Sequence, residues 1–202
     1  MLRRRDEQLI LPALNSVLEP DQRILEIGAG TGNYTVRVAR RCQAVVAVDA
    51  SPAMLGYLDD RLRREGITNV EPRLGRLPGE IGVPGRFDGV LALGVLNYLQ
   101  DLDATLKAFA GALKPGGWAI FTVAPPSLEG RVHALVERYA SRRVFLFSRG
   151  DIERAAIHAG LEVVVTGTAG VTRGGITLLA KARRSEDDSP QSPFVERVEH
   201  QG

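Results

Sequence analysis

Residues 24–34 read ILEIGAGTGNY, an apolar run that passes into a turn with glycines at positions 28, 30 and 32. The apolar run predicts a buried strand, and the pattern after the turn predicts a helix. Glycine leaves backbone uncovered, so a ligand can reach the unpaired amides at the start of that helix. Such amides suit a phosphate and a carboxylate equally well. The stretch therefore predicts a strand, a ligand-binding turn and a helix.

A second apolar run, residues 45–48, ends in Asp49, about 20 positions after Gly28, where an acid can recognise a ribose diol. Nicotinamide and adenosylmethionine sites both use an acid here. The dinucleotide fingerprint spaces its glycines as G-x-G-x-x-G, whereas this chain has its third glycine at Gly32 and Asn at position 33. The pattern Glu-x-Gly-x-Gly-x-Gly, which begins at Glu26, therefore disfavours a nicotinamide dinucleotide.

Apolar runs alternate with helical patterns along most of the chain, which predicts an α/β fold around a mostly parallel sheet. The clearest helix is 101–113, which Asp101 can cap, and another begins at the capping box of Ser148 and Asp151 and stops at Gly160. The expected strands are 23–27, 43–48, 69–74, 87–93, 117–124, 161–168 and 175–182.

The length of 202 residues fits one domain with one core. We expect an N-terminal helical segment over the active site at 1–20 and a main domain at 21–184. The composition predicts a flexible acidic tail at 185–202, where Ser, Pro, Asp and Glu dominate.

A net charge of +2 gives no global reason to expect a nucleic-acid partner. The single cysteine, Cys42, excludes an internal disulfide framework and a multi-cysteine metal site, and it favours a reducing, cytoplasmic location. No apolar run reaches the roughly 18 residues that a membrane span needs, so we expect none.

Four segments in order resemble the class I S-adenosylmethionine-dependent methyltransferases, namely 24–34, 45–55 (VVAVDASPAML), 87–99 (FDGVLALGVLNYL) and 113–123 (LKPGGWAIFTV). The resemblance covers roughly 20–182. It implies a Rossmann-like methyltransferase fold, with a seven-stranded, mostly parallel sheet, helices on both faces and an antiparallel last strand. It also implies S-adenosylmethionine as the cofactor.

The resemblance assigns cofactor-binding roles by position. Asp49 would bind the ribose, Ala50 and Met54 would flank the adenine, and Leu93 and Gly94 would line the methyl-donor channel. Many relatives have an acid after the third strand, but here Arg76 and Leu77 follow Gly75, which leaves adenine recognition at these residues open. The methionyl end would be held by Glu26, Gly28, Ala29, Gly30, Gly32 and Asn33.

The resemblance places the acceptor pocket in 1–20, 94–100 and an acceptor-side insert at 125–147. Positioning and desolvation can accelerate an in-line methyl transfer, so a dedicated base is optional. Asn97 and Tyr98 stand where many relatives have histidines. His133 in the insert is the first candidate for substrate contact, and a solvent-facing helix histidine is the alternative.

We therefore expect transfer of a methyl group to a small-molecule acceptor. One alternative is a non-catalytic, adenosylmethionine-binding regulatory module. The other is a nicotinamide-dependent oxidoreductase, which the glycine spacing and the segment 87–99 disfavour. No feature of the sequence specifies the acceptor, the methylated atom or the oligomeric state.

Overall fold

The computed structural model describes residues 10–76, 85–139, 143–172 and 175–184. The expected tail at 185–202 and Leu77 lie outside the described residues. So do residues 1–9 of the expected N-terminal segment.

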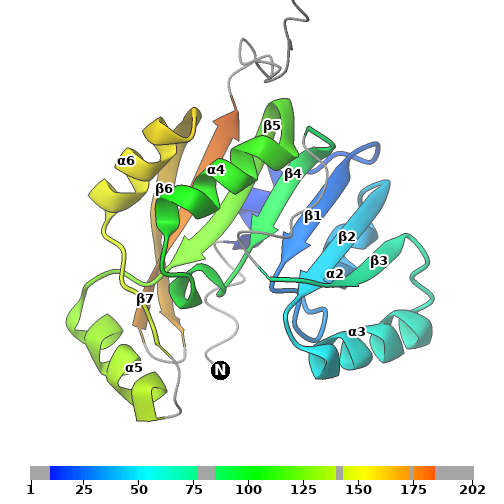
Figure 1. Ribbon diagram of the computed structural model, residues 1–202. Helices are drawn as coiled ribbons and strands as arrows, with labels where there is room; N and C mark the ends of the chain where they lie inside the picture. Colours follow the sequence, from blue (N-terminus) through cyan, green and yellow to red (C-terminus); the bar gives the residue numbers. More distant parts are fainter. Residues whose placement is uncertain (1–9, 77–84, 140–142, 173–174, 185–202) are drawn as a thin grey trace, which may run out of the picture.

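A sheet of seven strands forms the centre of the fold, in the order β3-β2-β1-β4-β5-β7-β6 (Figure 1). The first five strands in this order pair in parallel, whereas β7 is antiparallel to both β5 and β6. The predicted α/β fold with a mostly parallel sheet is confirmed. The strands are β1 Arg23–Ile27, β2 Ala44–Asp49, β3 Val70–Leu74, β4 Phe87–Ala92, β5 Leu113–Val123, β6 Leu161–Thr172 and β7 Gly175–Arg184.

The strand order reverses direction at β1. The chain proceeds from β1 outward through β2 to β3, and then returns to place β4 on the other side of β1. In open α/β sheets, ligands bind outside the carboxyl ends of the strands at such a reversal. The topology therefore predicts a ligand site among the loops that follow β1, β2 and β4.

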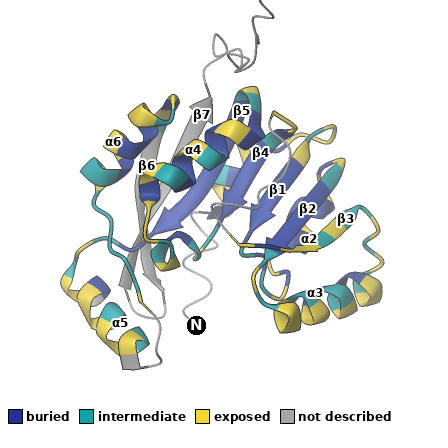
Figure 2. Cartoon of the chain, viewed as in Figure 1, coloured by how far each residue is buried: buried dark blue, intermediate teal, exposed yellow. Residues whose placement is uncertain are grey.

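Helices cover both faces of the sheet, and the strands β1, β2, β4 and β5 are largely buried (Figure 2). One core cluster joins α4 and α6 to the sheet around Phe109, Phe121 and Ile152. The other joins α2, α3 and residues 10–18 around Ile24 and Leu58. The helical elements are α2 Thr35–Ala39, α3 Pro52–Glu65, the 3-10 helix η1 Leu96–Tyr98, α4 Leu102–Ala112, α5 Leu128–Tyr139 and α6 Arg149–His158.

The described part of the N-terminal segment is a core element. Residues 10–15 are helical and include Pro12 near their start, a place where proline is tolerated because its missing N–H has no helical partner. Ile10, Leu14, Val17 and Leu18 are all buried in the cluster that contains α2. This burial accounts for the apolar positions in 10–18, and a role over the active site stays a prediction.

The ends of α4 and α6 follow their sequence signals, but β5 begins earlier than expected. Asp101 caps α4 by accepting a hydrogen bond from the Ala104 amide at 2.8 Å, and both halves of the Ser148 capping box are present on α6. The strand β5 begins at Leu113, directly after α4, and not at residue 117. The difference arises because Leu113 pairs with Phe87 before a register shift, and the shift accommodates the Pro-Gly-Gly turn within the strand.

Gly89 of β4 gives a test of the core. A Cβ atom at this position would lie 2.3 Å from Cζ2 of Trp118, a ring that is only 4% exposed. Because overpacking a filled core costs about 1–3 kcal/mol, we expect Gly89→Ala to lower the free energy of unfolding by about 2 kcal/mol or more. Chemical denaturation measures the change.

Gly56, in the exposed middle of α3, is the matched control. A Cβ there meets no atom within 4 Å, so Gly56→Ala should raise the free energy of unfolding by roughly 0.5–1 kcal/mol. Equal effects of the two substitutions would show that Trp118 does not pack against Gly89 as described.

Candidate active site

A cavity of about 540 Å³ lies at the carboxyl ends of β1, β2 and β3, beside η1. Its volume is within the range of ordinary small-ligand sites, about 300–1,000 Å³. It is lined by Ile27, Gly28, Val48, Asp49, Ala50, Gly75, Arg76, Val95, Tyr98 and Leu99. The cavity therefore lies at the edge where the strand order reverses.

Asp49, the last residue of β2, connects the glycine turn to the start of α3. Its Oδ2 accepts a hydrogen bond from the Gly30 amide at 2.8 Å, and its Oδ1 accepts one from the Ser51 amide at 2.9 Å. A carboxylate has about four acceptor positions, so each oxygen can accept one further hydrogen bond. Asp49 is thus both a structural acid satisfied by turn amides and an acceptor on the cavity wall.

The glycine turn needs glycine for two reasons. Gly28, Gly30 and Gly32 have φ angles of 72°, 56° and 80°, a region that side chains rarely adopt. A Cβ at Gly28 would lie 2.8 Å from Val95 Cβ, and one at Gly32 would lie 2.5 Å from Leu58 Cδ1. At Gly30, the nearest atom to such a Cβ is the Gly28 carbonyl oxygen at 4.0 Å. The turn is therefore packed at Gly28 and Gly32 and leaves open space at Gly30.

Glu26 lies on β1, where it is only 4% exposed. Burial raises its pKa to about 7; the Thr35 hydroxyl lowers it and the Asp49 carboxylate raises it further. Within the described part of the chain, Glu26 Oε2 and Thr35 Oγ1 are buried and lack a hydrogen-bond partner of good geometry. A buried acceptor without a donor is costly, which makes Glu26 a candidate for contact with a ligand.

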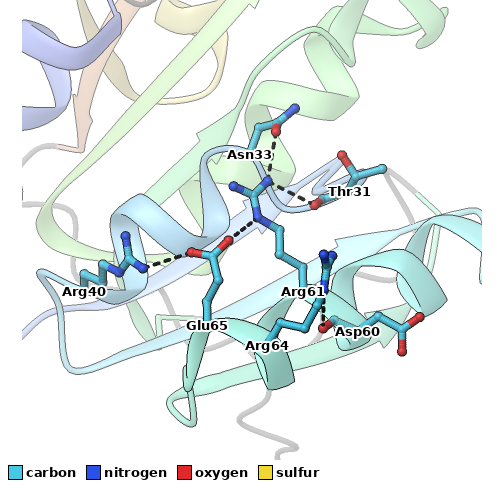
Figure 3. A network of polar contacts seen from close by, with 7 residues as sticks. All are labelled: Thr31, Asn33, Arg40, Asp60, Arg61, Arg64 and Glu65. Atoms are coloured by element: carbon cyan, nitrogen blue, oxygen red, sulfur yellow. Dashed lines mark hydrogen bonds and ion pairs between the residues drawn. The ribbon is translucent and has the colours of Figure 1, made fainter.

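Arg61 of α3 supports the outer side of the glycine turn (Figure 3). Its Nη1 donates to Asn33 Oδ1 at 2.9 Å and to the Thr31 carbonyl oxygen at 3.4 Å, while its Nε donates to Glu65 Oε1 at 2.7 Å. Arg40 also pairs with Glu65, at 2.9 Å. The hydrogen bond from Arg61 is the main reason that the pKa of Glu65 lies below its usual value. Sequence reasoning missed Arg61, since a helix arginine has no signal of this role.

Asn97 and Tyr98 have different surroundings. Asn97 Oδ1 accepts from the Ala124 amide at 2.6 Å, and the Asn97 carbonyl oxygen accepts from the Phe145 amide at 2.7 Å. Asn97 therefore joins η1 to the end of β5 and to the segment after α5. Tyr98 is 40% exposed and lines the cavity.

The cavity brings together some of the predicted site residues. Gly28, Asp49, Ala50, Arg76 and Tyr98 line it, and Val95 and Leu99, which lie in the stretch 94–100 predicted for the acceptor pocket, complete its wall beside η1. The segment 87–99 contained the signal for these two apolar residues, since they follow β4. His133 lies in α5, but its side chain is outside the described residues. Predicted residues absent from the described lining are Glu26, Ala29, Gly30, Gly32, Asn33, Met54, Leu93, Gly94 and Asn97.

A profile of the family described as "Methyltransferase domain" matches residues 1–166. The chain therefore belongs to this family, and it is a member of the class I S-adenosylmethionine-dependent methyltransferases, whose cofactor is S-adenosylmethionine. No helix in the described residues is long and apolar enough to cross a membrane.

The relatives differ in what they act on. The chain is 34% identical over 113 residues to a protein-L-isoaspartate O-methyltransferase of Nitrobacter winogradskyi, covering 54% of this chain and 48% of that protein. It is 48% identical over 128 residues to a probable ribosomal RNA small subunit methyltransferase A of Methanosarcina acetivorans, covering 60% of this chain and 45% of that protein. The chain thus spans about half the length of these curated relatives.

A solved structure of the magnesium protoporphyrin IX methyltransferase of Synechocystis, with bound S-adenosylhomocysteine, is similar in fold. The TM-score is 0.72 at 20% identity, over 91% of this chain and 83% of that one.

Glu26 predicts a pH dependence of stability. Its folded-state pKa of about 7 exceeds the usual 4.5, so its contribution to stability is full below about pH 4.5 and is lost as the pH rises through about 7. The loss is of the order of 3 kcal/mol. Glu26→Gln has no titrating proton, so its stability should not show this loss. As the pH rises from about 4 to about 8, the difference in unfolding free energy between the variant and the native protein should shift by about 3 kcal/mol in favour of the variant. Urea titrations of both proteins measure this, and parallel pH profiles would contradict it.

Proposed function

We propose that this protein transfers a methyl group from S-adenosylmethionine to a small-molecule acceptor, with the cofactor in the cavity between β1, β2, β3 and η1. The observation that carries the proposal is the Asp49 carboxylate, fixed by two backbone amides on the wall of a ligand-sized cavity. The oxidoreductase alternative is excluded by the family to which the chain belongs.

The residues present fit the cofactor. Each Asp49 oxygen retains acceptor capacity for a ribose hydroxyl, and a carboxylate that is already held rigidly loses little entropy on accepting it. Glu26 Oε2 offers a buried acceptor for the methionyl ammonium group, which would return its pKa toward the usual value. The remaining methionyl contacts would come from the backbone of residues 28–33.

The adenine and the methyl group would lie on either side of Asp49. Ala50 and Met54, at the start of α3, would flank the ring, and Gly75 and Arg76 supply cavity wall on the β3 side. Leu93 and Gly94 would border the methyl group. The Gly94 amide donates to the buried Thr122 hydroxyl at 2.7 Å, which fixes this turn against β5.

Bound S-adenosylmethionine supplies a methyl group on a positively charged sulfur, open to in-line attack by an acceptor atom. The protein's part is then to hold both molecules in line and to exclude water. Val95 and Leu99 provide apolar wall beside Tyr98, and Asn97 fixes η1 through its two hydrogen bonds. Proton removal from the acceptor needs no dedicated residue when the acceptor atom is already deprotonated.

Asp49→Ala should weaken the binding of S-adenosylhomocysteine by about tenfold or more, because it removes charge-assisted hydrogen bonds to the ribose. Isothermal calorimetry measures the affinity. The matched control is Asp88→Ala in β4, whose carboxylate binds Lys114 Nζ at 2.7 Å and the Arg23 amide at 2.8 Å near the amino end of the strands. The control should lose stability but keep its affinity, and equal affinity losses would refute the assignment.

The acceptor class is tested by incubating the protein with S-adenosylmethionine labelled in its methyl group and an extract of the source cells. The extract is then separated into metabolites, protein and RNA. We expect label in the metabolites. Label confined to protein or RNA would contradict a small-molecule acceptor, and cofactor binding without transfer to any fraction would support the regulatory alternative.

A further inference from the structure

A groove of about 510 Å³ lies between α5 and residues 143–145. Figure 1 shows α5 beyond the carboxyl end of β5, apart from the helices that cover the sheet. Asp49 and the glycine turn are not among its lining residues, so it is a second site in the described chain. It is lined by Arg131, Ala134, Leu135, Arg138, Arg143, Val144 and Phe145.

The three arginines of the groove carry positive charge on one face of the described chain. Arg131, Arg138 and Arg143 form no ion pair within the described part of the chain. Their neighbours on α6 differ, since Arg149 pairs with Glu153 and Arg154 with Asp151. Three arginines that line one groove favour an anion there, because each guanidinium group can donate two parallel hydrogen bonds to a carboxylate or phosphate.

The same groove also presents apolar surface. Leu135 is 55% exposed, and half-buried Val144 and Phe145 form the opposite wall. Leu128, Val132 and Val136 continue an apolar stripe along α5 and are each more than half exposed. Exposed apolar surface beside unpaired charge suits a ligand that is amphipathic.

A direct connection joins this groove to the cofactor cavity. The Phe145 amide donates to the Asn97 carbonyl oxygen at 2.7 Å, and the next two residues, Tyr98 and Leu99, line the cavity. The Phe147 amide binds the Ala124 carbonyl oxygen at 2.9 Å, which fixes the segment to the end of β5. These hydrogen bonds therefore fix one wall of the groove relative to one wall of the cavity.

We propose that the groove binds the anionic end of the methyl acceptor, and that the acceptor is an amphipathic molecule with a carboxylate or phosphate group. The arginines hold the anion, and Leu135, Val144 and Phe145 contact the adjoining apolar part. This inference rests on the proposed function, because it assigns the groove to the acceptor of that reaction.

Calorimetry on the full chain, saturated with S-adenosylhomocysteine, tests the proposal with four probes below their micelle concentrations. Dodecanoate and dodecyl phosphate should bind, and their relative affinities distinguish the two anions. Dodecyltrimethylammonium has the same dodecyl chain with a positive charge, and acetate has the carboxylate without the long alkyl chain. Both should bind at least tenfold more weakly. Added salt should weaken the binding of the anions, because exposed charges are screened.

The variants Arg131→Gln, Arg138→Gln and Arg143→Gln should each weaken dodecanoate binding about three- to tenfold and leave S-adenosylhomocysteine affinity within about threefold. Arg63→Gln on α3, an exposed arginine that pairs with Asp60, is the matched control and should change neither affinity. With an identified acceptor, the groove variants should raise KM more than they lower kcat.

Equal binding of the cationic and anionic probes would overturn the proposal, and so would unchanged affinity in all three groove variants. If S-adenosylhomocysteine still binds in these experiments, the proposed function is not contradicted. Binding to phosphatidylglycerol vesicles without binding of free dodecanoate would assign the groove to a membrane surface and overturn it too. A chain that does not bind S-adenosylhomocysteine in the first titration would refute the proposed function itself, and the acceptor role with it.

Discussion

The carboxylate of Asp49 holds together the parts on which the rest of the site depends. One oxygen binds the Gly30 amide and the other binds the Ser51 amide, so a single side chain fixes both the glycine turn after β1 and the loop that leads into α3. Ser51 in turn caps α3 by accepting from the Met54 amide. Two loops are thereby joined at one edge of the sheet, where the cavity opens.

The site combines a glycine turn held by side-chain contacts with a buried acid, Glu26, whose burial destabilises its charged form. The turn is clamped from outside by Arg61 and from inside by the close approach of Val95 to Gly28. Glu26 lies beneath it with one carboxylate oxygen unsatisfied among the described residues, and its raised pKa reports the cost of that burial. Groups that destabilise a fold in this way commonly belong to functional sites, since a bound ligand can supply the missing partner.

The sequence predicted the elements whose ends have local signals. The capping box at Ser148 and the cap at Asp101 were found where expected, because each depends on side chains three residues apart. The start of β5 was misplaced, since the pairing of Leu113 with Phe87 is a tertiary contact that no local pattern encodes. Within the site, Asp49 and Gly28 could be predicted from spacing.

Other features of the site became visible only in three dimensions. The hydrogen bond of Asn97 to Ala124 and the contact of Arg61 with the turn both join segments far apart in the chain. Their residue types are common on protein surfaces, so the sequence alone gave them no distinguishing mark. The roles of His133 and Leu77 stay predictions.

The central claim is that the cavity at Asp49 holds the cofactor, and a crystal structure of the protein with S-adenosylhomocysteine tests it most directly. The account predicts ribose hydroxyls within hydrogen-bond distance of Asp49, with the Gly30 and Ser51 amides still bound to the same carboxylate. A ligand bound at another place, or a ribose that does not contact Asp49, would contradict it.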